Sequence, residues 1–264
     1  MTSTKPDFDA LLNQAHALAN QASSVILPRF RAKVDIAHKG GNDFDPVTEA
    51  DKEAERVMRE LLKERFPEHG IIGEEFGNEN EDAEYCWVLD PIDGTRAFIM
   101  GQPLWGVLIG VARKGVPIVG MMEQPFSGER FWAADGKAFY RRGETEQTIQ
   151  TRACAKLEDA LLGSTTPDMF DAANLARFDS LAEACRLRRY GGDCYNYCLL
   201  AMGEIDLVVE AGLQTYDILP LIPVVEAAGG VVTTWEGGDA SKGGRIIASG
   251  DRALHEQALK HLNT

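Results

Sequence analysis

Two aspartates three residues apart, Asp90 and Asp93, are the side chains whose types and spacing predict chemistry most directly. They follow an apolar run typical of a buried strand. Pro91 ends ladder pairing and Gly94 permits a tight turn, so both carboxylates can reach one point. Two such carboxylates repel each other unless a hard cation lies between them. The amides of Gly94 and Thr95 are donors suited to phosphate, so the segment predicts a metal ion and a phosphate group together.

Other acidic residues stand where such a site could recruit them. Glu74 ends a short apolar run, and Asp217 precedes the apolar stretch 218–225. Considered alone, Asp217 is typical of a helix N-cap and Glu74 of a solvated turn acid. The pair Asp90 and Asp93 favours a metal over turn chemistry, because an acid at the end of a buried strand carries a desolvation cost.

Thr95 has two interpretations. It could cap a helix after Gly94, or its hydroxyl could orient a water molecule against a carboxylate such as Asp51. Asp51 itself follows Thr48 by three residues, which is close to a capping box. Spacing alone does not link residues 51, 74, 90 and 217.

The composition describes a globular protein with an acidic surface. The 264 residues are 44% hydrophobic and 26% charged, and the formal net charge is -14. That charge repels nucleic-acid backbones and anionic membranes, so neither is expected as a partner. No apolar stretch approaches the roughly 20 residues that span a bilayer. The N-terminus lacks an apolar signal core, so a cytoplasmic location is expected.

Cysteine and histidine predict no further site. The five cysteines are irregularly spaced, which argues against a disulfide framework. Cys194 and Cys198 lie four apart on one face of an expected helix, but no second Cys/His pair completes a zinc set, so buried free thiols are expected. None of the five histidines has metal-ligand spacing, so catalysis without histidine is expected.

The elements that must position these residues change character along the chain. In the first half we expect a helix that begins at residue 8 and ends near Pro28, and a second that begins at residue 48 and ends near Phe66. Strands are expected at 71–75, 85–90, 105–112, 116–123 and 130–134. The polar segment 141–152 has no periodicity, and it separates an α+β N-terminal lobe, 1–145, from an α/β C-terminal lobe, 146–264. In that second lobe, which would complete the site, we expect strands at 161–164, 206–210, 231–234 and 245–249 and helices at 174–187, 194–202, 217–228 and 251–262.

The segment Asp-Pro-Ile-Asp-Gly-Thr at 90–95 resembles the signature of the inositol monophosphatase family of magnesium-dependent phosphatases. Three further segments resemble motifs of that family in the same order: Val-Thr-x-x-Asp at 47–51, Gly-Glu-Glu at 73–75, and Tyr-Asp at 216–217 with a Gly pair at 229–230. Each piece is short, whereas the ordered set covers nearly the whole chain.

The resemblance implies a fold, a cofactor and a site. The fold is the α/β sugar-phosphatase fold with αβαβα layers and a site between two lobes. Two or three Mg²⁺ ions would be held by the side chains of Glu74, Asp90, Asp93 and Asp217 and by the carbonyl of Ile92. Asp51 and Thr95 would position the attacking water, and the amides of Gly94 and Thr95 would hold the phosphate. An all-oxygen ligand set suits Mg²⁺, which supplies a nucleophilic water near neutral pH. Family members are often homodimers.

Departures from the inositol enzymes resemble the histidinol-phosphate phosphatase branch of the family. Arg96-Ala97-Phe98 replaces the Thr-Asn-Phe typical of inositol enzymes, and Asp193 stands where they usually carry a small residue. Histidinol phosphate has a cationic end that Asp193 and Glu210 could pair with. Arg96 could bind the phosphate or pair with an acid of the protein. Without the family, Asp193 is equally typical of a helix N-cap, and Glu210 could simply end a strand.

The sequence therefore predicts a magnesium-dependent phosphomonoesterase acting on a small phosphate ester, L-histidinol phosphate in histidine biosynthesis. A second hypothesis is an inositol-1-phosphate phosphatase with a broad polyol-phosphate range. A third, of another class, is a non-catalytic binding protein on the same fold. The intact set of acids argues against the third, because simple folding does not require it.

Overall fold

The computed structural model describes residues 5–32, 36–38 and 46–263. For 36–38 and 46–48, which form the antiparallel pair β1 (Ile36–His38) and β2 (Pro46–Thr48), it describes the backbone alone. The side chain of Thr48, part of the predicted capping box, therefore lies outside the described residues.

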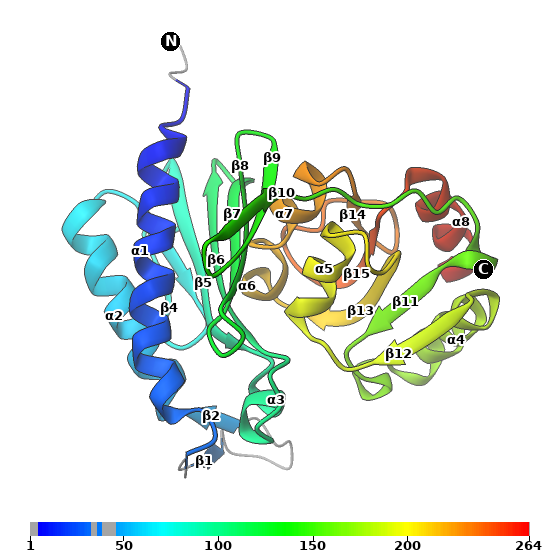
Figure 1. The fold of residues 1–264 in the computed structure, drawn as a ribbon, viewed down its shortest axis with the longest axis horizontal. Coiled ribbons are helices and arrows are strands. Elements are labelled where there is room, and N and C mark those ends of the chain that lie inside the picture. Colours follow the sequence, from blue (N-terminus) through cyan, green and yellow to red (C-terminus); the bar gives the residue numbers. More distant parts are fainter. Residues whose placement is uncertain (1–4, 33–35, 39–45, 264) are drawn as a thin grey trace.

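Two amphipathic helices form the first layer. The helices α1 (Phe8–Ile26) and α2 (Glu49–Arg65) pack on each other and on one face of an eight-stranded sheet (Figure 1). Asp7 begins α1 by accepting a hydrogen bond of 3.0 Å from the amide of Ala10, and the short 3₁₀ turn η1 (Leu27–Arg29) follows the helix. Leu11, Ala15 and Leu18 on α1 are buried at three- and four-residue spacing, and α2 buries Ala54, Met58 and Leu62 in the same way. The two predicted helices are therefore confirmed.

The eight-stranded sheet holds most of the first half of the chain. Its order is β10-β9-β8-β7-β6-β5-β3-β4, antiparallel except for the parallel pair β3 and β5. The strands are β3 (Gly70–Gly73), β4 (Gly77–Glu79), β5 (Tyr85–Asp93), β6 (Gly106–Arg113), β7 (Val116–Gln124), β8 (Glu129–Ala134), β9 (Lys137–Arg142) and β10 (Thr145–Thr148). The sequence analysis missed β4, β9 and β10. The edge strands β4 and β10 are short, polar and exposed, and β9, which lies between β10 and β8, carries basic residues at both ends.

A five-stranded sheet holds most of the second half, in the order β12-β11-β13-β15-β14. Its strands are β11 (Leu161–Ser164), β12 (Leu187–Tyr190), β13 (Leu207–Leu213), β14 (Val231–Thr234) and β15 (Gly244–Ser249), and the 3₁₀ turns η2 (Leu157–Asp159) and η3 (Pro167–Met169) flank β11. The helices α4 (Ala172–Ala184) and α8 (Arg252–Leu262) pack together on its outer face. The prediction of a helix over 174–187 is therefore wrong at its end, where β12 begins.

A helical layer separates the two sheets. It contains α5 (Cys194–Ala201), α6 (Thr215–Ile218) and α7 (Ile222–Ala227), which contact strands of both sheets (Figure 1). The predicted single helix 217–228 is wrong: it is broken between α6 and α7, where Pro220 and Pro223 cannot donate backbone hydrogen bonds. The order of layers is α-β-α-β-α, which confirms the predicted fold.

Three large apolar cores and one small one fill the spaces between these layers. Along β6, Val107 and Ile109 face α1 and α2, whereas Leu108 faces the central helices, as the alternation of a strand requires. The cysteines are free thiols, as predicted. Among the described residues, no helix is long and apolar enough to cross a membrane.

Candidate active site

Strand β5 carries two of the predicted carboxylates at its C-terminal end. Asp90 is opposite Leu108 and Asp93 opposite Gly106, and the register shifts between them. The shift falls at Pro91, which has no N–H to donate to the ladder. Asp90 is only 1% exposed, so its carboxyl group lies within the protein rather than in a solvated turn.

Asp217 joins this pair from the other half of the chain. Carboxylate oxygens of Asp90, Asp93 and Asp217 all lie within 4.8 Å of one another. The N-cap interpretation of Asp217 is wrong in position, because Gln214 is the N-cap of α6. Asp217 instead completes a capping box, with Oδ2 accepting a hydrogen bond of 2.6 Å from the Gln214 amide. One side chain thus closes a helix turn and contributes to the cluster.

Glu74 lies at the end of β3, beside Asp90. Its amide donates a hydrogen bond of 3.3 Å to the carbonyl of Leu89 on β5. Burial, with the charges of Asp51, Glu75 and Asp217, raises the pKa of Glu74 to about 8, and a hydrogen bond to Asp90 acts in the opposite direction. Glu74 is therefore part of the acidic cluster rather than a solvated turn acid.

The cluster is electrostatically unfavourable without a cation. Burial first, and then the charges of neighbouring carboxylates, raise the pKa of Asp90 and of Asp93 well above the usual range. Oδ1 of Asp90 is buried and has no hydrogen-bond partner among the described residues. A divalent cation fits this arrangement, because it would ligate such an oxygen and compensate the repulsion. The donor set, all oxygen, is of the kind that Mg²⁺ prefers.

The turn after β5 begins a short helix, α3 (Thr95–Ile99). Gly94 precedes it with φ 83°, a left-handed conformation that glycine adopts readily. The hydroxyl of Thr95 donates a hydrogen bond of 3.1 Å to the carbonyl of Ile92. Phe98 is a buried residue of α3. Its ring lies 5.0 Å from that of Trp105 and 5.4 Å from that of Phe30, measured between ring centroids.

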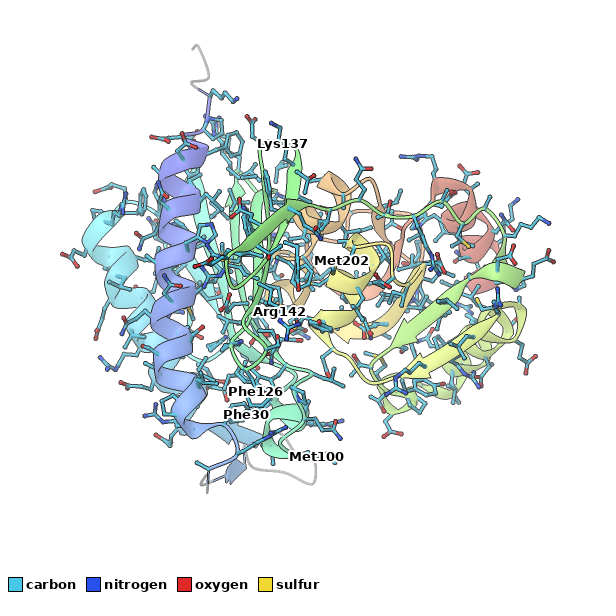
Figure 2. All side chains as sticks on the ribbon, in the orientation of Figure 1. Phe30, Met100, Phe126, Lys137, Arg142 and Met202 are labelled. Atoms are coloured by element: carbon cyan, nitrogen blue, oxygen red, sulfur yellow. The ribbon has the colours of Figure 1, made fainter. Side chains whose placement is uncertain are left out.

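Aromatic packing continues from this helix toward the surface. The rings of Phe30 and Phe126 lie 5.1 Å apart, and Figure 2 shows both near Met100, the residue that follows α3. The guanidinium of Arg31 lies over the ring of Phe126, and its Nε donates a hydrogen bond of 3.0 Å to the carbonyl of Gly101. The hydrogen bond of Arg31 thus holds the chain just after α3.

A cavity of about 280 Å³ opens over the acids and is lined by both halves of the chain. From the predicted site it is lined by Glu74, Asp90, Ile92, Asp93, Gly94, Thr95, Arg96, Asp193 and Asp217. An inner pocket of about 110 Å³ shares Asp93, Asp193 and Asp217 with the cavity and is also lined by Glu210 and Tyr197. The sequence analysis missed Tyr197 and also three lining residues of the loop after β11, namely Thr165, Thr166 and Met169.

Asp193 lies against Gly94, because a methyl group on Gly94 would approach its side chain to 3.2 Å. The backbone of Asp193 has φ 45° and ψ -135°. It occupies the N-cap position of α5, but its side chain makes no capping hydrogen bond, so the N-cap interpretation does not explain the carboxylate. The following amide, of Cys194, donates a hydrogen bond of 2.7 Å to Oδ2 of Asp93. Burial and the charge of Glu210 raise the pKa of Asp193 to about 7, whereas Arg96 acts to lower it.

Glu210 lies in the middle of β13, so it does not simply end a strand, and it is 2% exposed. Oε1 accepts hydrogen bonds from the amide and the hydroxyl of Thr165, at 3.0 and 2.6 Å, and Oε2 accepts one of 2.9 Å from the hydroxyl of Tyr197. Burial raises the pKa of Glu210, and these three hydrogen bonds lower it. The carboxylate is therefore held by three hydrogen bonds in the lining of the inner pocket.

Asp51 and Arg96 occupy different positions relative to the cavity. Asp51 is buried on α2, 2% exposed, and is not one of the residues that line the cavity. Its charge nevertheless raises the pKa of Glu74 and of Asp90. Arg96 is exposed on α3 and lines the cavity opening.

Comparison with known proteins agrees with this geometry. Residues 7–264 match the inositol monophosphatase family. The chain belongs to this family. Its members include solved structures with the same layers, among them an inositol monophosphatase from Zymomonas mobilis with a TM-score of 0.88 and 41% identity, which covers 98% of this chain and 100% of that one.

Two curated members of the inositol monophosphatase family are similar over most of their length. The bifunctional phosphatase IMPL2 of Arabidopsis thaliana is 41% identical, over 97% of this chain and 76% of the relative. A histidinol-phosphatase of Mycobacterium tuberculosis is 34% identical, over 94% of this chain and 96% of the relative. The predicted family is thus confirmed, and phosphatases are prominent among the relatives.

Proposed function

We propose that this protein is a magnesium-dependent phosphomonoesterase whose preferred substrate is L-histidinol phosphate. The observation that carries the proposal is the cluster of Asp90, Asp93 and Asp217, with Glu74 beside it, next to the turn at Gly94. Buried like charges at this spacing lower stability unless they bind a cation. Such clusters are therefore associated with metal binding rather than with folding.

The residues take separate roles in the proposed reaction. Glu74, Asp90, Asp93 and Asp217, with the carbonyl of Ile92, would hold the metal ions. Bound Mg²⁺ supplies a water of lowered pKa and charge compensation at the phosphate. Asp51 and Thr95 would orient the attacking water, and the amides of Gly94 and Thr95 would hold the phosphate oxygens.

The inner pocket favours a cationic leaving group. Asp193 and Glu210 are two carboxylates in the lining of this small pocket, and Thr165 and Tyr197 fix the second of them. An ammonium or imidazolium group would pair with these acids, whereas a neutral polyol gains little from them. The histidinol-phosphatase named among the relatives supports the same substrate. Inositol 1-phosphate remains the alternative, and Arg96 is proposed to contact the phosphate.

A phosphate-release assay tests the proposed activity. Histidinol phosphate and inositol 1-phosphate are compared at equal concentration with Mg²⁺ and with EDTA. We expect release to depend on Mg²⁺ and to be faster with histidinol phosphate. Equal or faster release from inositol phosphate would overturn the substrate assignment. No metal-dependent release from any small phosphate ester would favour a binding protein instead.

Asp193→Ala tests the role of the pocket acids. Loss of a charge-assisted hydrogen bond should lower kcat/KM for histidinol phosphate by about 10- to 100-fold. The loss with inositol phosphate should be much smaller, because that substrate has no cation to pair. Asp168→Ala is the matched control: it removes an exposed acid from the neighbouring turn η3, outside the lining of both pockets. Equal losses for the two substrates would contradict the assigned role of Asp193.

A further inference from the structure

Helix α2 carries a stripe of buried charged residues, Asp51, Glu55 and Arg59, at successive four-residue intervals. Their exposed fractions are 2%, 0% and 5%. Residues four apart in a helix lie on the same face. Charged side chains are rarely buried to this degree unless they are paired. Only the first belongs to the proposed catalytic machinery, so the other two require an explanation.

Both oxygens of Glu55 hold the turn that follows Glu74. Oε2 accepts a hydrogen bond of 2.7 Å from the amide of Glu75, and Oε1 accepts one of 3.2 Å from the amide of Phe76. Oε1 also accepts a hydrogen bond of 2.7 Å from Nε of Arg59. The carboxylate on the helix is therefore joined to the two peptide groups immediately after the site acid.

Arg59 extends this connection across the β3–β4 hairpin. Its Nη1 donates a hydrogen bond of 2.9 Å to Oε1 of Glu79, and its Nη2 donates to the carbonyl of Gly77. Gly73, just before Glu74, leaves room for the pair, because a methyl group there would overlap Oε1 of Glu55. The hairpin turn is thus held on both sides. On one side it is bonded to α2, and on the other the amide of Glu74 donates a hydrogen bond to Leu89 on β5.

We infer that Glu55, supported by Arg59, is a positioning residue that fixes Glu74 relative to Asp51 and Asp90. Three elements meet here: α2 carries Asp51, the end of β3 leads into Glu74, and β5 carries Asp90. Glu55 connects α2 to the turn after β3 through its hydrogen bonds to the amides of Glu75 and Phe76. The inference rests on the proposed function, in which Glu74 holds a metal ion. Groups that orient a ligand typically change metal affinity 10- to 100-fold when they are removed.

Mg²⁺ affinity, measured by calorimetric titration without substrate, tests this role. Glu55→Gln keeps the shape of the side chain but cannot accept all three hydrogen bonds. We expect the variant to bind Mg²⁺ about 10- to 100-fold more weakly than the wild type. Glu123→Gln is the matched control, because Glu123 also forms a buried ion pair, with Arg130. That pair is bonded to His16 and Asn20 on α1, so its loss should lower stability and leave Mg²⁺ affinity unchanged.

A second variant covers the case in which Glu55→Gln does not fold. Arg59→Lys keeps the charge but lacks the planar fork that reaches Glu55, Gly77 and Glu79 together, so a smaller loss of Mg²⁺ affinity is expected. Wild-type affinity in Glu55→Gln, or in Arg59→Lys if the first does not fold, would overturn the inference and leave the proposed function intact. A wild-type protein that binds no Mg²⁺ would overturn both.

Discussion

Hydrogen bonds from backbone amides fix one oxygen of several site carboxylates before any ligand arrives. The Cys194 amide holds Oδ2 of Asp93, and the Gln214 amide holds Oδ2 of Asp217. A carboxylate has a second oxygen to offer to a cation. Asp90 differs, because its Oδ1 is buried with no partner among the described residues. At the scale of single residues, the buried oxygen of Asp90 therefore favours a bound metal ion.

Asp90→Asn should separate activity from stability. The amide removes one of several like charges, so unfolding by urea in EDTA should require about 1 kcal/mol more free energy than in the wild type. Phosphate release with Mg²⁺ should fall by about 100-fold or more, because an oxygen ligand of full charge is lost. A variant that is less stable in EDTA and still active would contradict the assignment of Asp90.

Local sequence predicted some site residues and not others. Asp90 and Asp93 share one strand end, so spacing was enough to expect them together. Glu74 and Asp217 are distant in sequence and were linked only by the family resemblance. Glu55 was missed, although a charged residue within the apolar stripe of a predicted helix was a signal that could have found it.

Thr165 and Tyr197 were missed for a different reason. They become important through hydrogen bonds to Glu210 that connect residues 45 and 13 positions apart in sequence. No local pattern of charge or hydrophobicity marks such partners. Only the packing of β11, α5 and β13 brings them to one pocket.

At the scale of elements, the segment that carries Asp217 rests in a recess of the eight-stranded sheet. Gly110 on β6 is paired with Gly120 on β7, so two side chains are absent at adjacent points. The turn at Leu219 and Pro220 fills that space, and a methyl group at Gly110 would approach Leu219 to 2.9 Å. The position of α6 is thus set by two glycines on another layer.

Gly120→Ala should move this segment. A methyl group there would overlap the carbonyl of Pro220, and overpacking of this kind typically lowers the free energy of unfolding by about 1–3 kcal/mol. Phosphate release should fall as well, because Asp217 lies three residues before Pro220. In the control Gly238→Ala the nearest atom would be Oγ1 of Thr234 at 3.3 Å, and a change within about 0.5 kcal/mol is expected. Equal urea midpoints for the two variants would contradict close packing of this segment against Gly120.

Periodicity predicted the long elements well and the interrupted ones poorly. The helix α1 has a regular apolar stripe over 19 residues, and it ends at Ile26, close to the predicted end near Pro28. The break between α6 and α7 was missed because the apolar pattern continues through Pro220. The two prolines were a signal of this break in the sequence, whereas the fit of Pro220 against Gly120 is visible only in three dimensions.

At the scale of the whole molecule, histidine burial links folding to pH. His255 on α8 is 4% exposed, and its ring nitrogens lie 2.9 Å from the hydroxyl oxygens of Thr233 and Ser249. Burial, with the charge of Arg252, lowers its pKa from 6.5 to about 4. Between these values the unfolded chain binds a proton that the folded protein does not bind. Stability from this residue is therefore present above pH 6.5 and is lost as the pH falls toward 4.

Urea unfolding at pH 7 and pH 5, in EDTA, tests this linkage. When the pH is lowered, the free energy of unfolding of the wild type should fall by about 1–2 kcal/mol more than that of His255→Gln. The variant has no imidazole at this position to titrate in that range. The raised pKa values of Glu74 and Asp193 act in the opposite direction, so the difference between the two proteins is the relevant quantity. The same change in both proteins would contradict the linkage.

The backbone at Asp193 has a consequence for engineering. A non-glycine residue with φ 45° and ψ -135° carries about 1–3 kcal/mol of conformational strain, which glycine would relieve. A laboratory selection for heat resistance would therefore tend to replace this aspartate. The same replacement would remove a carboxylate that the proposed chemistry uses. A gain in thermostability at this position would therefore come with a loss of turnover.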